Sequence, residues 1–270
     1  MFQKSLDLAV KLGLLNKNVA KQVGNVKKQK KKIDFWTQKE FEKVISTFDI
    51  SDYYEHYTFI IIWLLFMTGL RLGEAQALEW TDINFEDKTL TVSKSMYYKS
   101  ANEFYVTEPK TRAGNRTIAL DDVTISYLAE WKSVQGRNVV SKYVLSYNGL
   151  PTNKSTTKHI IERHSKLAGV HTIKTHALRH SHASLLISLG ENAIVVRDRL
   201  GHEDVETTLG TYGHLYPNTN KEVAKKLNNL ISVQKDDTIK RNFISNQFVK
   251  NRQSGCNNIS LDCEEKEWDS

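Results

Sequence analysis

Residues 176–212 contain His176-Ala-Leu-Arg-His180, then Leu200-Gly-His202, then Tyr212. His176 and Arg179 stand three residues apart on a predicted helix over 176–189, so they project from roughly the same face. The apolar residues of that helix, which suit a packed core, are Leu178, Leu185, Leu186 and Leu189. This stretch therefore predicts a helix with one polar, basic face and one face packed in a core.

A second basic position follows the longest apolar run of the chain. The run Phe59–Met67 is far shorter than the ~20 residues of a membrane span and predicts a buried helix. Thr68-Gly-Leu-Arg-Leu-Gly-Glu74 comes next, and its glycines allow a tight turn around Arg71. Arg71 either pairs with Glu74, three residues on, or uses that pairing to present its guanidinium to a phosphate.

Local signals predict a mostly helical α+β fold with a small three-stranded antiparallel sheet. Thr37 and Glu40 form a capping-box pattern that marks a helix start. The expected helices besides 176–189 are Gln38–Phe48, Tyr54–Thr68, Leu72–Leu78, Val123–Val134, Thr157–Leu167, Ala193–Leu200, Val205–Thr211 and Lys221–Ile231. A period of two between residues 88 and 120 predicts the strands Thr89–Lys94, Glu103–Thr107 and Arg116–Leu120.

The composition restricts the class of partner and the compartment. Lys and Arg number 38 against 31 Asp and Glu, and the net charge of +7 favours a polyanionic partner, although it also serves solubility. Hydrophobic residues make up 40% of the chain, which supports a core. Cys256 and Cys263 form neither a disulfide framework nor a metal-ligand spacing, and Met1–Lys11 is no secretory signal, so a cytoplasmic setting is expected.

The histidines of the central stretch allow a metal-binding alternative. His176 and His180 stand four residues apart, a spacing that can bind zinc, but no HExxH pattern and no nearby third ligand accompanies them. No metal is therefore expected. His182 falls nearer the apolar side of the helix and is expected to be a core residue.

Two arginines, two histidines and one tyrosine are the groups needed to break a phosphodiester without a metal. Two guanidiniums can hold the non-bridging oxygens of the transition state through paired hydrogen bonds. A tyrosine with a pKa near 10 is mostly protonated at neutral pH and needs a base when it attacks. If these side chains converge, Tyr212 is the nucleophile, and the phosphotyrosyl bond keeps the energy needed for rejoining.

At this point the chain resembles the catalytic domain of the tyrosine recombinases of the phage-integrase type, from about Ile33 to Leu230. The matching motifs, in family order, are Thr68–Glu74, Pro109-Lys-Thr111, His176–His180, Leu200–His202, and Thr207-Thr208 leading to Tyr212-Gly-His-Leu215. The resemblance implies a site-specific recombinase or integrase that cleaves and rejoins double-stranded DNA through a 3′-phosphotyrosyl intermediate. It implies a homotetramer on DNA, and no cofactor, membrane or small-molecule substrate.

The resemblance also implies a role for each matching residue. Arg71 and Arg179 resemble the arginines that grip the scissile phosphate, and Glu74 resembles the acidic residue that supports the first. His176 resembles the histidine that assists proton transfer and phosphate binding, and His202 resembles a hydrogen-bond donor to the phosphate. Lys110 resembles the lysine that protonates the leaving 5′ oxygen, and Tyr212 resembles the nucleophile. Tyr216 fits the last role less well, because Pro217 follows it directly.

The expected domain organisation is a remnant of the core-binding domain over 1–26, a basic linker over 27–34, a catalytic domain over 35–232 and a disordered tail over 233–270. The linker contains Lys27-Lys-Gln-Lys-Lys-Lys32 and either straps DNA phosphates or is a solvated hinge. The apolar stripe in Lys221–Ile231 packs either on its own domain or on a neighbouring protomer. An N-terminally truncated recombinase of a phage or mobile element is expected.

Two other functions are compatible with this fold. One is a non-catalytic DNA-binding remnant or regulator, against which the complete set of site residues argues. The other is a type IB topoisomerase, which shares the chemistry. The context of Thr207-Thr208 and Tyr212-Gly-His-Leu215 favours an integrase over a topoisomerase.

Overall fold

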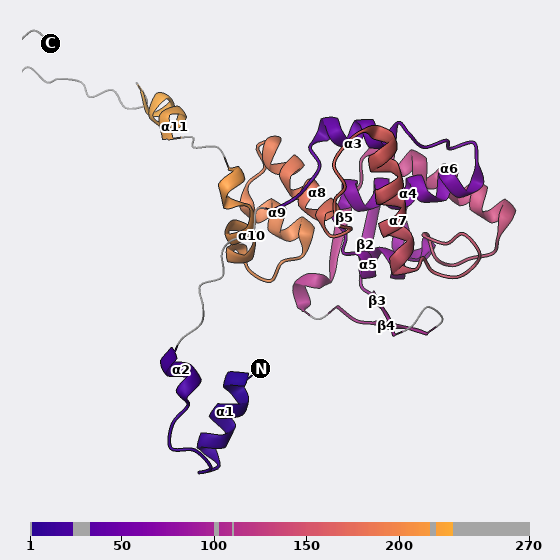
Figure 1. Ribbon diagram of the computed structural model, residues 1–270. Helices are drawn as coiled ribbons and strands as arrows, with labels where there is room; N and C mark the ends of the chain where they lie inside the picture. Colours follow the sequence, from indigo (N-terminus) through magenta and orange to yellow (C-terminus); the bar gives the residue numbers. More distant parts are fainter. Residues whose placement is uncertain (1, 24–32, 100–102, 110, 217–219, 229–270) are drawn as a thin grey trace, which may run out of the picture. The chain divides into compact units, whose positions relative to one another are not determined.

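The computed structural model describes residues 2–23, 33–99, 103–109, 111–216 and 220–228 (Figure 1). The expected tail, most of the expected linker and Lys110 lie outside these residues. The chain divides into two compact units, Met1–Tyr216 and Pro217–Ser270. The helices are α1 (Phe2–Lys11), α2 (Val19–Val23), α3 (Gln38–Ile45), α4 (Tyr53–Thr68), α5 (Leu72–Ala77), α6 (Asp122–Asn138), α7 (Lys154–Ala168), α8 (Ala177–Ser188), α9 (Ala193–Leu200), α10 (Val205–Tyr212) and α11 (Asn220–Leu227). Short 3₁₀ turns cover Trp80–Asp82 (η1), Arg112–Gly114 (η2) and Gly213–Leu215 (η3).

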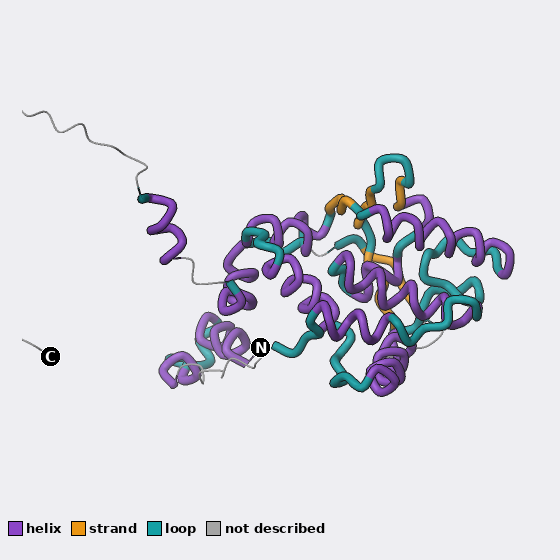
Figure 2. Tube along the Cα trace, turned by 90° about the horizontal axis from the view of Figure 1, so that it is seen from above, coloured by secondary structure: helices purple, strands orange, loops and turns teal. Residues whose placement is uncertain are grey.

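Helix α4 forms the centre of the main hydrophobic core. It is apolar on all sides and packs against α6, α7 and α8 (Figures 1 and 2). Asp52 caps its first turn by accepting from the backbone N–H of Glu55, and Gly69 ends it in the left-handed region at φ 65°. That end leads directly into the turn that carries Arg71.

The capping box predicted at the start of α3 is present. Thr37 accepts from the backbone N–H of Glu40, and the Glu40 carboxylate accepts from Thr37. The preceding Trp36 is fully buried, and its indole N–H donates to the carbonyl of His171 at 2.8 Å. These contacts fasten the entry of the chain to the segment that leads into α8.

The predicted three-stranded antiparallel sheet is present, but one of its predicted members is wrong. The sheet order is β1 (Ile83–Asn84), β2 (Thr89–Val92), β5 (Arg116–Ala119), with Leu90 opposite Ile118. The predicted strand Glu103–Thr107 is β4 (Phe104–Thr107), which pairs with β3 (Ser95–Tyr98) in a separate hairpin. Three of the four β4 residues are exposed, so no buried face holds this strand to the sheet.

A second, smaller core lies among α8, α9 and α10, which are neighbours in Figure 1. Its buried residues are Ala183, Ile187, Val196, Leu200 and Tyr212. Gly201 ends α9 in the left-handed region at φ 68°, and Asp204 caps α10. These two short helices place Tyr212 against α8. None of the helices described is long and apolar enough to cross a membrane.

Candidate functional site

Glu74 is a buried carboxylate that joins two arginines. Its Oε1 accepts from Arg71 Nη1 at 2.7 Å, and its Oε2 accepts from Arg116 Nη2 at 2.9 Å and from the backbone N–H of Arg71 at 2.9 Å. Burial alone would raise the pKa of Glu74, but the hydrogen bond and charge of Arg116, together with the donors of Arg71, lower it below its usual range. The carboxylate is therefore charged and fixes the direction of Arg71.

Arg179 is the most enclosed cation of the site, with only 2% of the residue exposed. Its Nη1 donates to the carbonyl of Gly69 at 2.8 Å, and its buried Nη2 has no hydrogen-bond partner among the described residues. Burial first, and then the charge of Arg71, lower the pKa of Arg179 to about 9. A buried cation with an unused donor is arranged to receive an anion.

The two arginines are held by carbonyls from distant segments. Arg71 Nη2 donates to the carbonyl of Gly201 at 3.1 Å, while Arg179 uses the carbonyl of Gly69. Both glycines have positive φ, and a Cβ on Gly69 would come within 2.6 Å of the His182 ring. Arg179 is thus bound to the end of α4, just before Arg71, and Arg71 is bound to the end of α9, just before His202.

The two predicted phosphate-binding histidines lie next to these arginines. His202 Nδ1 forms a 2.8 Å hydrogen bond with the buried Thr208 Oγ1, and burial followed by the charges of Arg179 and Arg71 lowers its pKa to about 4. His176 is exposed at the start of α8, and burial of its ring and the same two arginines lower its pKa. Both rings are therefore neutral at pH 7.

Tyr212 ends α10 and is 1% exposed. Its hydroxyl lies 2.7 Å from His180 Nδ1, and the two rings meet edge to face with centroids 5.6 Å apart. Burial raises the pKa of Tyr212 to about 12, and the charge of Arg179 opposes this rise only in part. The phenol is therefore protonated and enclosed in this state of the protein.

The structure brings five of the six predicted site residues into one electrostatic neighbourhood, and Lys110 lies outside the described residues. Arg179 interacts with Arg71 and Tyr212, and His176 and His202 both interact with the two arginines.

As expected, His182 is a core residue: it is 2% exposed, and Arg199 Nε lies 3.0 Å from its Nε2.

Sequence reasoning missed two residues of this neighbourhood. Arg116 ends the cation-rich segment that begins at Pro109, but its bond to Glu74 crosses 42 residues of sequence. His180 was considered only as a zinc ligand with His176. Its position four residues after His176, on the same face of the helix, was the available signal that it faces the same site.

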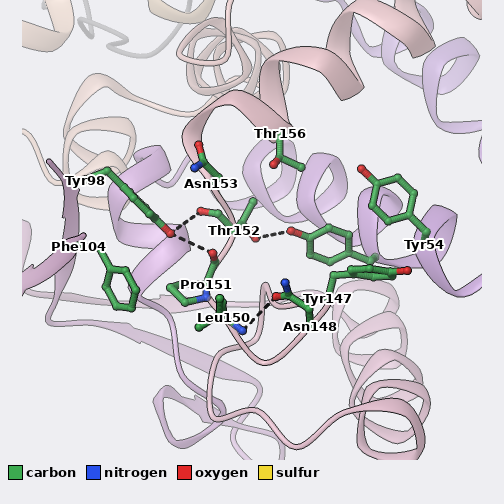
Figure 3. A pocket seen from close by; sticks show the side chains of 11 residues that line it. Tyr54, Tyr98, Phe104, Tyr147, Asn148, Leu150, Pro151, Thr152, Asn153 and Thr156 are labelled. Atoms are coloured by element: carbon green, nitrogen blue, oxygen red, sulfur yellow. Dashed lines mark hydrogen bonds between the residues drawn. The ribbon is translucent and has the colours of Figure 1, made fainter. Parts of the chain in front are cut away.

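A groove of about 840 Å³ adjoins the cluster and reaches from the first turn of α7 to His176. Its polar and basic lining includes Ser155, Lys158, Lys174 and Thr175, and Glu162 also faces it. A separate aromatic cavity of about 450 Å³ lies among Tyr54, Tyr57, Tyr98, Phe104 and Tyr147 (Figure 3). No residue of the arginine–histidine cluster lines that cavity.

Similar proteins were found by sequence and by structure. The phage integrase family matches residues 34–219. The ICEBs1 integrase of Bacillus subtilis is 36% identical over 236 residues, which cover 84% of this chain and 63% of that protein. A XerC-like tyrosine recombinase of Caldanaerobacter subterraneus is 29% identical over 62% of this chain and 48% of its own length. The chain thus spans 63% and 48% of the length of these two curated relatives.

Solved structures share the fold. A structure of the Tn1549 transposon integrase in complex with a circular intermediate DNA superposes with a TM-score of 0.68 at 19% identity, covering 84% of this chain and 76% of that one. The XerA recombinase gives a TM-score of 0.55 at 21% identity, covering 72% and 64%. The family match over residues 34–219 agrees with the order of the motifs and with the cluster around Tyr212. The chain therefore belongs to the phage integrase family.

Proposed function

We propose that this protein is a site-specific DNA recombinase that cleaves and rejoins DNA strands through a covalent tyrosine intermediate. The observation that carries the proposal is the convergence of Arg71, Arg179, His176 and His202 next to Tyr212. The proposal takes double-stranded DNA as the substrate and a mobile element or phage as its source.

In the proposed reaction the Tyr212 Oη attacks the phosphorus and the P–O5′ bond breaks. The 3′-phosphotyrosyl bond forms, and the leaving 5′ oxygen receives a proton, for which the sequence nominates Lys110. Arg71 and the unused Nη2 of Arg179 bind the non-bridging oxygens, where negative charge gathers. A single such arginine is worth ~10³–10⁵ in the rate of other phosphoryl transfers, so two arginines can supply much of the charge stabilisation of the transition state.

The histidines would bind the phosphate as neutral donors. His202 keeps Nδ1 on Thr208, which fixes the orientation of the ring and leaves Nε2 as the proposed donor to the phosphate. Reversal of the first step by a 5′ hydroxyl from another duplex completes the exchange. A tetramer of this chain on two duplexes would supply the four tyrosines that such an exchange uses.

The groove beside His176 is the proposed path of the DNA backbone away from the scissile phosphate. It contains hydroxyl side chains and the exposed Lys158 and Lys174. Such groups bind phosphates without reading bases. The logarithm of the DNA-binding constant falls linearly with the logarithm of the salt concentration, and each lysine that neutralises a phosphate makes this slope more negative by about 0.9.

A suicide substrate tests the proposed function. A nicked duplex that carries the element's junction loses its short 5′-hydroxyl strand after cleavage, so the covalent adduct accumulates and is seen on a denaturing gel. The wild-type chain should form the adduct, Tyr212→Phe should form none, and the matched control Tyr216→Phe should keep it.

Two results would overturn this proposal. One is an adduct that persists in Tyr212→Phe, which would move the nucleophile elsewhere. The other is a wild-type chain that binds the junction but forms no adduct at low salt, which would identify a non-catalytic DNA-binding protein. Relaxation of a supercoiled plasmid that lacks the junction would instead identify a topoisomerase.

A further inference from the structure

We propose that His180 is a catalytic residue that accepts the proton of Tyr212 as the phenol attacks the scissile phosphate. This inference rests on the proposed function and adds a role to a residue that is not among the six predicted site residues. It assigns His180, in the first turn of α8, to the nucleophile, and His176, the residue that precedes α8, to the phosphate.

The contact between the two residues has the geometry of proton transfer. His180 Nδ1 lies 2.7 Å from Tyr212 Oη, within the range in which a general base abstracts a proton. Tyr212 is almost completely buried, so bulk water does not compete for its hydroxyl. The contact joins the first turn of α8 to the last residue of α10, two helices that the small core holds together.

The charges around His180 keep its Nδ1 free to accept a proton. Burial first, then His176 and then Arg179, lower the pKa of His180 to about 4. The groups that face it are therefore His176 and Arg179 on its own helix and Tyr212 on α10. At neutral pH the ring is uncharged, and in the tautomer protonated on Nε2 the tyrosine hydroxyl donates to Nδ1. An incoming phosphate would offset the charge of Arg179 and so favour the imidazolium that forms.

His176 is placed less well for this task. It is exposed, and its ring meets the His180 ring edge to face at 4.9 Å. No hydrogen bond joins it to Tyr212 among the residues described. Its open position at the edge of the groove suits a group that contacts the DNA phosphate.

The step balances without any further reactant. The Oη–H bond of Tyr212 breaks and its proton moves to His180 Nδ1. The same oxygen forms the bond to phosphorus while the P–O5′ bond breaks, and the leaving oxygen takes a proton from a separate acid. In the reverse step the imidazolium returns its proton to the departing phenolate.

The decisive experiment isolates the nucleophile from the leaving group. A duplex with a 5′-bridging phosphorothiolate at the scissile position has a thiolate leaving group, which departs without an acid. Single-turnover cleavage is measured from pH 6 to pH 9 for wild type, His180→Gln and the exposed control His214→Gln. Gln keeps a hydrogen-bond acceptor for the hydroxyl but cannot take its proton.

The wild-type and His214→Gln rates should be independent of pH, because the base is already neutral. The His180→Gln rate should be at least ~100-fold lower at pH 7 and should rise about tenfold per pH unit, since phenolate must then form by ionisation. Imidazole in the buffer should accelerate His180→Ala and leave the wild-type rate unchanged. Lys110→Ala should regain rate on the phosphorothiolate, whereas His180→Gln should not.

Two outcomes would overturn the role of His180. A wild-type rate in His180→Gln would show that the base is elsewhere. A lower rate with the same flat pH profile would show that His180 only positions the tyrosine. Circular dichroism and DNA-binding measurements on each variant exclude misfolding as the cause.

A DNA-free measurement separates this inference from the proposed function. Fluorine NMR of 3-fluorotyrosine at position 212 reports the hydrogen bond whether or not the chain cleaves DNA. Its resonance should move in His180→Ala, which removes the partner of the hydroxyl, and stay in place in His214→Gln. An unmoved resonance refutes the pairing itself, while an absent adduct in the wild type refutes the recombinase assignment.

Discussion

Replacement of Glu74 by Gln tests whether the buried carboxylate organises the arginines of the site. The substitution keeps the shape of the side chain but removes a charge that two guanidiniums share at 2.7 and 2.9 Å. Arg116 is the more enclosed partner, with 7% of its side chain exposed, and would be left as a buried, uncompensated cation. Breaking one side of a buried ion pair costs ~3–5 kcal/mol.

The matched control is Glu79→Gln. Glu79 also accepts from two cations, Lys94 and Lys142, but 19% of its side chain is exposed and the Lys142 side chain is 65% exposed. Ion pairs of this kind contribute ~0–1 kcal/mol. Urea denaturation at pH 7 should therefore give a loss for Glu74→Gln several times that for Glu79→Gln. Glu74→Gln should also lower the cleavage rate, because Arg71 loses its anchor.

The pH dependence provides a second arm of the same test. The folded-state pKa of Glu74 lies below its ordinary value of 4.5, so its charge stabilises the protein above that pH. The stabilisation is lost as pH falls through the folded pKa. The difference between wild type and Glu74→Gln should be constant above pH 5.5 and shrink below pH 4.5. Equal losses for the two variants, or a difference that does not change with pH, would refute the reasoning.

Gly69, His182 and Arg179 each provide a further test. Gly69→Ala should lower the free energy of unfolding, measured in urea, by more than ~1 kcal/mol, because φ at Gly69 is 65° and the new Cβ would lie 2.6 Å from the His182 ring. The control Gly136→Ala, at a position with open space within α6, should raise the free energy of unfolding by ~0.5–1 kcal/mol. Burial lowers the pKa of His182 in the folded protein to about 3, whereas its pKa in the unfolded chain is near 6.5. Between pH 7 and pH 5 only the unfolded chain therefore binds this proton, and His182 alone should lower the free energy of unfolding by ~2 kcal/mol. Inorganic phosphate at ten times its dissociation constant should stabilise the wild type by ~1.4 kcal/mol in thermal unfolding, and Arg179→Gln should abolish this gain at matched ionic strength.

The parts of the fold that the sequence predicted correctly are encoded by neighbouring residues. The capping box of Thr37 and Glu40 and the apolar run of α4 can each be recognised from residues that are close in sequence. The pairing of β4 was not predictable in this way. Strand-forming residues do not identify the partner of β4, because which strand it pairs with depends on tertiary burial.

The same distinction applies to the site. The pairing of Arg71 with Glu74 is an i, i+3 contact, and the sequence included it among two alternatives. The contact of His180 with Tyr212 spans 32 residues, and it depends on how α9 and α10 fold back onto α8. Motif resemblance nominated individual residues, but only the folded chain shows which carbonyl or ring each one meets.

The hydrogen bonds that hold Arg71 and Arg179 join segments far apart in the sequence, which has a consequence for synthesis of the chain. Arg71 is held by a carbonyl 130 residues later, and Arg179 by one 110 residues earlier. Contacts this distant in sequence form late, after the entropy of closing long loops has been overcome. A nascent chain that lacks residue 201 therefore cannot form this anchor of Arg71, and Tyr212 is added only eleven residues later. Translation order thus delays assembly of the arginine cluster until the segment that supplies this carbonyl has been made.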